Sequence, residues 1–575
     1  MHLRSALKLL LALCLLFPLA AACAPASTQA PAPPTSAPSA TQAPIPTQGP
    51  LPTAQAISTA AAKPTLITGA AAPKAGGSMV SASAGDAVSF HPYTVTDSAS
   101  RGYQGLVYGG SLWEYDPRTL EPRPEVATGW TTSDDRLTYT FKLRDDLRWS
   151  DGTPLTSADY KWTFDQASNP ANKYPYISNL QLIASYEAPD PRTIVVKLKE
   201  PVVVGLEAAE AVSPLPKHIW QNLDWADPSK NPQIMAPTVS SGPYILKEWV
   251  KDDHATFVAN DNYHGGRPLI DTYTVRIVPS QEIAFQMLKS GEVDYASFTP
   301  DNYNEAKGLS NVAVYEWWPA AASWSYLGFN LRRPWLQDLN VRHALSHAIN
   351  REEIAQFVLN GLARPTYSIF PPSSWVYNPN VPKYEHNPTT AKELLDKAGW
   401  TPGPGGIRQK DGQQLKLRVL FGPNTSKVRE RIATIAQQAW GDLGIAVDVQ
   451  GLEWGTYLST IESEPFDWDV SVLGWNSTLE PHWMNQIWRE DSIPDLNHVA
   501  YVNKRVEQLF DQGVREFDRD KRVQIYQEIQ QLISADAPYV FTTTDLSYIG
   551  INNRIGGIEP TPLGIGHNRE RWFIK

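Results

Sequence analysis

The chain has 575 residues, 42% of them hydrophobic, so it is ordinary in composition and too long to fold around a single core. Its formal net charge of −10 argues against a broadly basic surface that would bind nucleic acid, so no nucleic-acid partner is predicted. The two cysteines are Cys14 and Cys23, so the chain after residue 23 has no disulfide, no cysteine metal site and no cysteine nucleophile.

Residues 1–22 are typical of a signal peptide. Two basic residues precede an apolar run from Leu9 to Leu19, which is short for a membrane span. The Ala-Ala-Ala-Cys sequence that ends at Cys23 resembles a bacterial lipobox, although Ala20 stands where a leucine is usual. We predict that Cys23 is lipidated and anchors the protein to a membrane; cleavage without lipidation, which would give a freely secreted protein, is the alternative.

Residues 23–76 follow as a segment rich in Ala, Pro, Ser, Thr and Gln with almost no charge. Such a composition cannot bury a core. The segment is therefore predicted to be a disordered tether between the membrane and the folded body.

From residue 77 onward, strand and helix patterns alternate along the chain. Strands are predicted at 78–83, 131–144 (a hairpin), 244–249, 255–260, 272–279, 415–420 and 467–475, and helices from 156, at 283–289, 341–359, 391–398, 428–443 and 453–462, with two more in 504–535. Mixed elements of this kind predict an α/β protein with more than one lobe.

One long run carries a family resemblance. The sequence EVATGWTTSDDRLTYTFKLRDDLRWSDGTPLTSADYKWTFD at 125–165 resembles the signature of the family 5 extracellular solute-binding proteins, which bind dipeptides, oligopeptides or nickel for ABC importers. Further stretches resemble the same family in the same order, among them SGPYILKEW at 241–249, YLGFNL at 326–331 and TTAKELLDKAGW at 389–400. The resemblance covers residues 77–575.

The resemblance implies an α/β, two-lobed periplasmic-binding-protein-like fold of type II. Lobe one would comprise residues 77–325, with an extra subdomain at 111–190, and the chain would return to it at 542–575. Lobe two would comprise residues 326–541. A ligand would bind between the lobes, which would close on it.

The function that the resemblance implies is capture of oligopeptides by a non-enzymatic, monomeric lipoprotein that delivers them to an ABC permease and ATPase complex. It would lie on the outer face of the cytoplasmic membrane, or in the periplasm if an outer membrane exists. No cofactor, catalytic residue or bound metal is expected. An oligosaccharide or another neutral solute is the alternative ligand, and a nickel chelate is a more remote one. A secreted carbohydrate-active enzyme is a further alternative, but no convincing pair of catalytic carboxylates is found.

The candidate ligand site centres on the end of the predicted strand 467–475. There Gly474-Trp475 opens into a polar turn, and placed polar groups beside aromatic rings are typical of ligand pockets. The same aromatic residues could instead form core. The predicted ligand-binding residues are Trp454, Trp475, Asn476, Ser477, Thr478, Glu480 and Trp483, with Arg101 and Tyr103 as looser candidates from lobe one.

The resemblance also implies where charges should lie in this site. In peptide binders of the family, an aspartate three residues after the tryptophan holds the ligand's ammonium group, but here that position is Thr478. Glu480 is the nearest carboxylate and is predicted to replace it. An arginine that can meet a peptide carboxylate is replaced by Val472. The charged clamps for a peptide are therefore weakened or moved.

Two other clusters have structural interpretations. The acidic residues between Asp134 and Asp151 fall on predicted turns, where aspartate is common. His343 and His347 have the i, i+4 spacing of metal ligands, but no third ligand is evident in the sequence. His482, beside Glu480, is a remote candidate for contact with a metal chelate.

Overall fold

The computed structural model describes residues 73–95, 97–321, 323–422 and 427–575. The predicted signal peptide, the predicted lipidation site at Cys23 and most of the predicted tether lie outside the described residues. Among the residues described, no helix is both long enough and apolar enough to cross a membrane.

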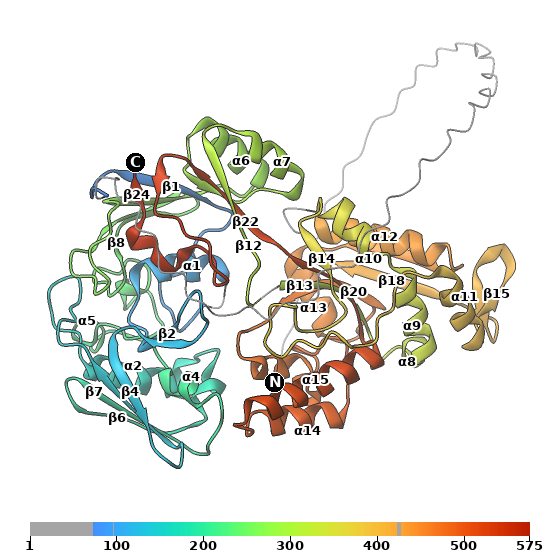
Figure 1. Cartoon of the computed structure of the whole chain (residues 1–575), viewed down its shortest axis with the longest axis horizontal. Helices are drawn as coiled ribbons and strands as arrows, with labels where there is room; N and C mark the ends of the chain where they lie inside the picture. The colour runs from blue at the N-terminus through green and yellow to red at the C-terminus, as the bar shows by residue number, and fades with distance from the viewer. Residues whose placement is uncertain (1–72, 96, 322, 423–426) are drawn as a thin grey trace, which may run out of the picture. The chain divides into compact units, whose positions relative to one another are not determined.

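A mixed seven-stranded sheet combines strands from both ends of the described chain. Its order is β12 (Val312–Trp317), β22 (Ser547–Asn552), β11 (Tyr295–Ala296), β1 (Ser78–Ser83), β10 (Thr272–Ile277), β9 (His254–Ala259) and β8 (Tyr244–Val250). β1 pairs in parallel with β10, and β22 pairs antiparallel with β12. In Figure 1, β22 runs in red beside green β12. The sheet therefore joins β1, the first described strand, and β22, a strand near the C-terminus.

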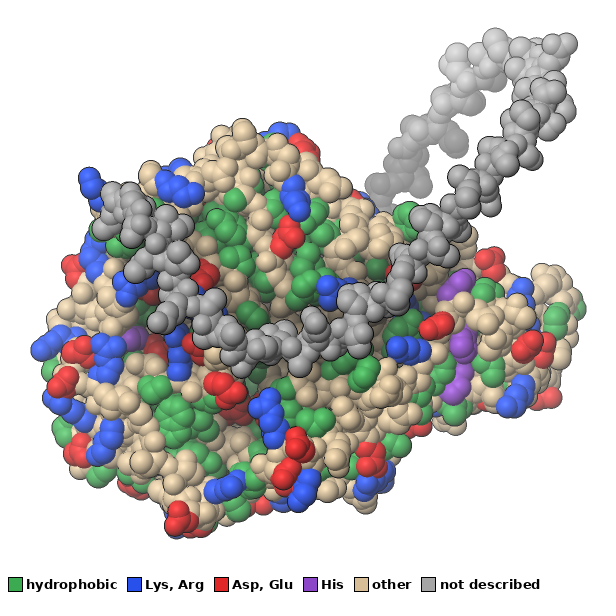
Figure 2. Space-filling model, in the orientation of Figure 1, with side chains coloured by type: hydrophobic (Ala, Val, Ile, Leu, Met, Phe, Trp, Pro, Cys, Tyr) green, Lys and Arg blue, Asp and Glu red, His purple; other side chains and the backbone are tan. Residues whose placement is uncertain are grey.

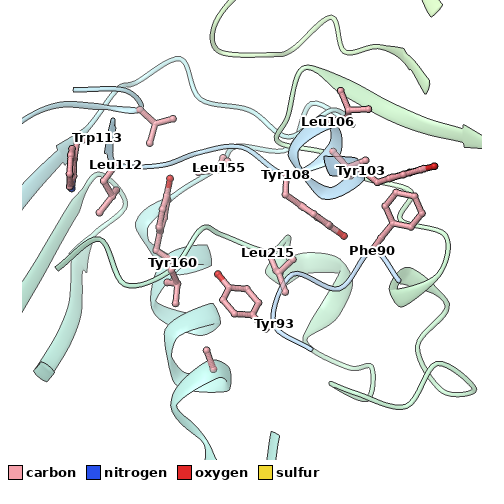
Figure 3. Packing of buried hydrophobic residues seen from close by; sticks show 14 of the residues in the cluster. Phe90, Tyr93, Tyr103, Leu106, Tyr108, Leu112, Trp113, Leu155, Tyr160 and Leu215 are labelled. Carbon is pink, nitrogen blue, oxygen red and sulfur yellow. The ribbon is translucent and has the colours of Figure 1, made fainter. Parts of the chain in front are cut away.

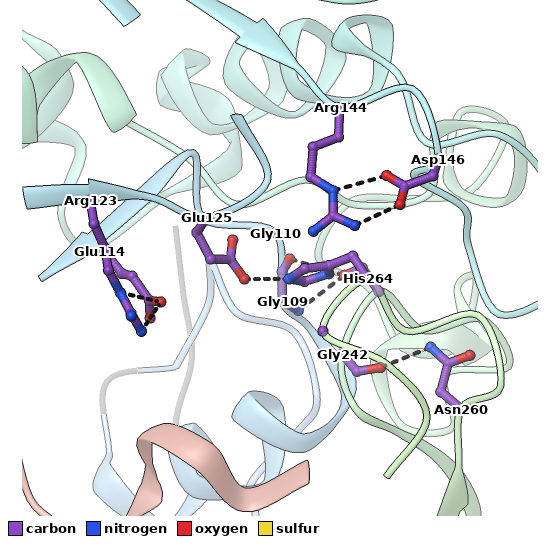
Figure 4. Close-up of polar contacts among 12 residues, drawn as sticks. Gly109, Gly110, Glu114, Arg123, Glu125, Arg144, Asp146, Gly242, Asn260 and His264 are labelled. Carbon is purple, nitrogen blue, oxygen red and sulfur yellow. Dashed lines mark hydrogen bonds and ion pairs between the residues drawn. The ribbon is translucent and has the colours of Figure 1, made fainter. Parts of the chain in front are cut away.

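A four-stranded antiparallel sheet lies in the segment predicted as an extra subdomain, except that one strand, β7, lies just beyond residue 190. Its order is β4 (Ala127–Thr132), β5 (Thr138–Leu143), β7 (Thr193–Leu198) and β6 (Ile183–Asp190). Polar contacts tie the start of this region to the loop after β9 (Figure 4). His264 Nε2 lies 2.5 Å from a carboxylate oxygen of Glu125, and Arg144 makes two hydrogen bonds to Asp146.

The seven- and four-stranded sheets share one hydrophobic core, and we call this part of the molecule the first unit. A six-stranded sheet forms the centre of the second unit. Its order is β14 (Ala363–Pro365), β21 (Tyr539–Asp545), β13 (Ser323–Phe329), β20 (Val470–Asn476), β18 (Lys416–Phe421) and β19 (Ala446–Gly451). β13 is antiparallel to both β20 and β21, whereas β18 is parallel to β19 and β20. Because β13 already starts at Ser323, this sheet begins three residues before the predicted lobe boundary at 326.

Alternation along β20 explains why this sheet is covered on both faces. Val470 and Val472 belong to one buried cluster, whereas Leu473 belongs to another and Trp475 packs against that second cluster. Successive side chains of a strand point to opposite faces, so a strand that is apolar at both sets of positions needs cover on both sides. Helices α9 (Leu339–Ala348), α11 (Pro388–Lys397) and α12 (Val428–Gly441) cover the first face, and α13 (Trp454–Glu462), α14 (Lys504–Gly513) and α15 (Arg519–Asp536) cover the second.

The remaining elements are short. The other α-helices are α1 (Ser98–Val107), α2 (Ser157–Ser168), α3 (Ile177–Leu180), α4 (Gly205–Glu210), α5 (Lys217–Trp220), α6 (Gln281–Ser290), α7 (Tyr303–Gly308), α8 (Pro334–Gln337) and α10 (Arg351–Glu353), which runs into a π-helical turn, η4 (Ile354–Val358). The 3-10 turns are η1 (Pro170–Asn172), η2 (Pro232–Ile234), η3 (Pro300–Asn302), η5 (Pro404–Gly406), η6 (Pro481–Ile487), η7 (Glu490–Ser492) and η8 (Gly566–Arg571). The small strands are β2 (Trp113–Tyr115), β3 (Pro122–Pro124), β15 (Thr401–Pro402), β16 (Arg408–Lys410), β17 (Gln413–Gln414), β23 (Ile555–Gly556) and β24 (Phe573–Ile574).

Local sequence accounts for the helix ends. The hydroxyl of Ser280 accepts a hydrogen bond from the Ile283 amide at the start of α6, and Gly291 ends that helix in a left-handed conformation with φ of 81°. The predicted helix at 341–359 is interrupted instead. α9 ends at Ala348, where the buried Arg351 of the next helix donates to the carbonyl of Phe541 on β21. This contact anchors the interruption to the sheet.

The core of the first unit is rich in aromatic rings (Figure 3). Phe90 and Tyr103 meet edge to face with their centroids 6.2 Å apart, and the Tyr160 hydroxyl donates to the carbonyl of Gly110. On the surface, side chains of both charge signs are interspersed over the face in Figure 2.

Candidate ligand-binding site

β20 places Trp475 and Asn476 at its end. The register sets Trp475 opposite Trp324 of β13, whose side chain is buried. The indole of Trp475 stacks on His498 with centroids 5.7 Å apart and planes 11° from parallel. Burial lowers the pKa of His498, so its ring is neutral at pH 7. Trp475 is therefore held flat by a neutral ring and half-buried, and the exposed Asn476 follows it.

A cavity of about 370 Å³ lies in front of this strand end, and we call it the Trp475 cavity. Its wall is formed by β13, β20, the connection from β21 to β22, the first turn of α12 and nearby loop residues. The lining residues are Gln281, Phe298, Pro300, Ser323, Trp324, Ser325, Leu359, Leu362, Val428, Arg429, Gly474, Trp475, Asn476, Asp545, Leu546 and Tyr548. Aromatic rings, amides and two charged groups thus share one concave surface, as in many ligand sites.

The two charged groups of the Trp475 cavity are Asp545 and Arg429. Burial raises the pKa of Asp545 to about 6, and the hydroxyl of Thr543, which donates to its carboxylate at 3.0 Å, opposes the rise. Burial also lowers the pKa of Arg429. Both charges are therefore poorly solvated in the structure, and each would be stabilised by a group of opposite sign.

Trp454 stands behind Arg429 instead of lining the cavity. It is the first residue of α13, and the Glu453 carboxylate caps that helix by accepting from the Thr456 amide. The guanidinium carbon of Arg429 lies 5.1 Å from the centroid of the Trp454 ring, which stacks on Tyr457. Trp454 thus supports a charged cavity residue.

Glu480 lies in a different pocket, of about 460 Å³, which we call the Glu480 pocket. Its carboxylate caps η6 by accepting from the His482 amide, and it pairs with Arg522 at 2.5 Å. The hydroxyl of Thr478 donates to the Glu480 carbonyl at 2.6 Å. Glu480, which we expected to replace the loop aspartate as an ammonium clamp, is therefore already neutralised by an arginine and is separated from Trp475.

Trp483 borders a third pocket, of about 350 Å³, together with Glu207 and Glu210. Its ring also packs against the core of the first unit. The predicted loop residues are thus divided among three cavities: Trp475 and Asn476 share the first, whereas Glu480 and Trp483 line the others. Ser477 is buried beside them.

The two looser candidates from lobe one lie elsewhere. Tyr103 is 2% exposed and packs in the aromatic core beside Phe90, so our expectation that it faces the cleft was wrong. The helical spacing of α1 turns this ring inward together with the other apolar residues of the helix. Arg101, on the outer face of α1, is exposed and donates to the Tyr176 hydroxyl at 2.7 Å.

Comparison with known proteins decides the family. Residues 121–492, more than half of the chain, match the model of the bacterial extracellular solute-binding proteins, family 5 (middle region). The chain belongs to this family. The family consists of solute-binding proteins and not of enzymes, and its members face the periplasm or the cell exterior.

Relatives of this family 5 protein align with it along most of its length. The oligopeptide-binding protein AppA of Bacillus subtilis is 28% identical over 506 residues, which span 87% of this chain and 92% of AppA. The structure of AppA with a nonapeptide matches with a TM-score of 0.76 at 29% identity, covering 88% of this chain and all of AppA. Helicobacter pylori DppA with the peptide STSA matches with a TM-score of 0.73 at 26% identity, covering 87% and 98%.

A third structure shows the fold alone. NikZ of Campylobacter jejuni with Ni(L-His) has a TM-score of 0.76 at 24% identity, covering 86% of this chain and 99% of NikZ. The two-lobed α/β fold expected from the family resemblance is therefore confirmed.

Sequence reasoning missed two charged residues that line the Trp475 cavity of this family 5 protein. Asp545 ends β21, 70 residues after Trp475, and Arg429 lies in the first turn of α12, 46 residues before it. Asp545 did carry a signal, because it interrupts a run of apolar and hydroxyl side chains where the chain was predicted to return to lobe one. Only the packing of β21 beside β13 shows that this carboxylate shares a cavity with Trp475.

Proposed function

We propose that this protein captures peptides for an ABC importer and catalyses no reaction. The observation that carries the proposal is the Trp475 cavity, in which one aromatic wall, one carboxylate and one guanidinium face the same space. A peptide offers matching groups: planar amides, side chains and charged ends. AppA and DppA, which resemble this chain over most of its length, are described in complex with peptides.

The strand ends around the cavity suit a peptide main chain. Asn476 is exposed at the end of β20 and offers both a donor and an acceptor. The broad faces of Trp475 and the neighbouring apolar residues exclude water from such hydrogen bonds, which strengthens them. Binding and release, without covalent chemistry, are all that the role requires.

The cellular arrangement is proposed from the sequence. Cys23 would carry the lipid anchor, and the segment 23–76 would tether the folded monomer to the outer face of the cytoplasmic membrane. The loaded protein would deliver its peptide to a permease and ATPase complex. Mass spectrometry of the membrane-extracted protein tests the anchor: a diacylated or triacylated N-terminal Cys23 supports it, and an unmodified mature N-terminus contradicts it.

A ligand screen tests the function. Purified protein is heated with di- to nonapeptides, oligosaccharides and Ni²⁺ chelates, and the melting temperature is recorded. A ligand that binds only the folded state stabilises it by about 2.7 kcal/mol at a hundredfold excess over Kd. Shifts with peptides support the proposal, and their absence contradicts it.

A neutral solute is the second candidate, and a specific observation favours it. Thr478 replaces the loop carboxylate expected of peptide binders, and Glu480 is committed to Arg522. If oligosaccharides alone raise the melting temperature, and Trp475→Ala removes that shift, this second function replaces the first.

A further inference from the structure

We propose that Asp545 is the acceptor for a cationic group of the ligand, an ammonium or guanidinium, in the Trp475 cavity. The inference deepens the proposed peptide-binding function and rests on it. The loop after Trp475 places no carboxylate in this cavity. Asp545, at the end of β21 just before the chain passes to β22 of the other large sheet, would supply that charge.

The position of Asp545 suits this role. It is the last residue of β21, paired in register with Ala363 of β14, and its carboxylate lines the Trp475 cavity. The Thr543 hydroxyl donates to it at 3.0 Å. No lysine, arginine or histidine of the described residues forms an ion pair with it. Its lone pairs are therefore only partly satisfied by the protein.

Three other buried carboxylates of this fold have an arginine partner, whereas Glu207 and Glu210 have no ion pair among the described residues. Asp294 pairs with Arg554, Asp469 lies 3.4 Å from Arg333, and Glu480 pairs with Arg522. An unpaired carboxylate in a poorly solvated site costs several kcal/mol. Asp545 faces an open cavity instead of an arginine, so a ligand can supply the missing cation.

The cavity also holds a charge of the other sign. Arg429 has a cation–π contact with Trp454 and a long hydrogen bond of 3.4 Å to the Gly422 carbonyl, but no carboxylate partner among the described residues. Asp545 and Arg429 both line the cavity, and no ion pair joins them in the described residues. A ligand that carries separate positive and negative groups fits this arrangement.

Binding of matched peptides to the full-length protein tests the inference. Isothermal titration compares a tripeptide with a free amino terminus, its N-acetyl form, and N-acetyl forms with lysine or norleucine at the second position. The proteins are the wild type, Asp545→Asn and the control Asp448→Asn, which removes the same charge from an exposed position on β19. Thermal melts and near-ultraviolet circular dichroism verify that each variant is folded.

We expect Asp545→Asn to weaken binding of the cationic peptide at least tenfold, and Asp448→Asn to leave it unchanged. Removal of the ligand cation by acetylation should weaken binding to the wild type and cost nothing further in Asp545→Asn. The amino-terminal pair identifies an ammonium at the peptide end, and the lysine–norleucine pair identifies a side-chain cation. Equal affinity of wild type and Asp545→Asn for every cationic peptide would overturn the inference.

Simple cations separate this result from the function itself. Agmatine and cadaverine carry guanidinium and ammonium groups without a peptide bond. If no peptide binds but these cations bind the wild type and not Asp545→Asn, the peptide function fails and the role of Asp545 stands. If neither peptides nor these cations bind the wild type, both proposals are overturned.

Discussion

The carboxylate of Glu480 and the guanidinium of Arg522 lie 2.5 Å apart, with side chains only 11% and 9% exposed. This pair joins the loop after β20 to α15, and Glu480 also caps η6. The carboxylate that lies closest in sequence to the predicted clamp position is thus a structural ion, fixed before any ligand arrives.

Breaking this pair should be costly. Arg522→Met leaves the Glu480 carboxylate buried without its cation, so we expect the free energy of unfolding to fall by about 3–5 kcal/mol. Urea denaturation measures the change. Arg519→Met is the control, because Arg519 is exposed on the same helix and also lies over Trp375, and it should cost under about 1 kcal/mol. Equal losses in the two variants would show that the Glu480 pair contributes nothing special.

Trp475 should be important for ligand binding. Trp475→Ala removes a wall of the cavity and the stack on His498, so we expect at least a tenfold loss of affinity for whichever solute binds. Trp475→Phe keeps a flat ring and should retain most of the affinity. Titration calorimetry compares the three proteins. Full affinity in Trp475→Ala would remove this cavity from consideration as the ligand site.

Most strands and helices follow from periodicity, because one-sided or two-sided burial leaves a pattern in neighbouring residues. Strand β1 has the predicted bounds, and Gly291 ends α6 where the left-handed glycine was expected. The site was harder to predict from the sequence. Residues that lie close in sequence, such as Trp475 and Glu480, face different cavities because the chain bends at 479–480, after β20. Asp545 comes from another strand, and strand order is decided by long-range packing that no local pattern records.

The pair Glu207 and Glu210 should make stability depend on pH. Burial raises the pKa of Glu207 to about 7 and of Glu210 to about 8, from an ordinary 4.5, and the charge of Glu207 adds to the rise at Glu210. The folded protein thus holds protons that the unfolded chain has released. The stability from these groups is full below pH 4.5 and is lost as pH rises through 7 and 8.

Glu210→Gln tests this pH dependence. The amide cannot ionise, so the variant does not lose stability as Glu210 does. The difference in free energy of unfolding between variant and wild type should therefore shift by about 1–3 kcal/mol in favour of the variant from pH 5 to pH 9. Urea unfolding at several pH values gives the difference, in which other titrating groups cancel. A constant difference across this range would contradict the assignment.

Gly422 should be intolerant of a side chain. A Cβ there would lie 2.6 Å from Cε3 of Trp454, so Gly422→Ala must displace the ring beneath Arg429. We expect a loss of about 1–3 kcal/mol in stability and weaker binding at the Trp475 cavity. Gly441→Ala is the control, because a Cβ at that helical position meets nothing within 4 Å. If Gly422→Ala is as stable as wild type, the Trp454 ring is free to move.

Asp545 should lower the stability of the empty protein. Its folded pKa of about 6 exceeds the ordinary value of 3.8, so the folded state binds more protons than the unfolded chain between these values. The stability that protonation provides is full below pH 3.8 and lost as pH rises through 6. Asp545→Asn removes the buried charge and should therefore be about 1–3 kcal/mol more stable than wild type at pH 8, with little difference at pH 4.

Chemical denaturation without ligand at both pH values measures this difference, and Asp448→Asn, which removes an exposed charge, should show none. Binding-site residues often lower the stability of the protein without its ligand, and we expect the same of Asp545 if it binds a cation. If Asp545→Asn is instead less stable at pH 8, the carboxylate is stabilised within the protein itself, and the charge is not held in reserve for a ligand.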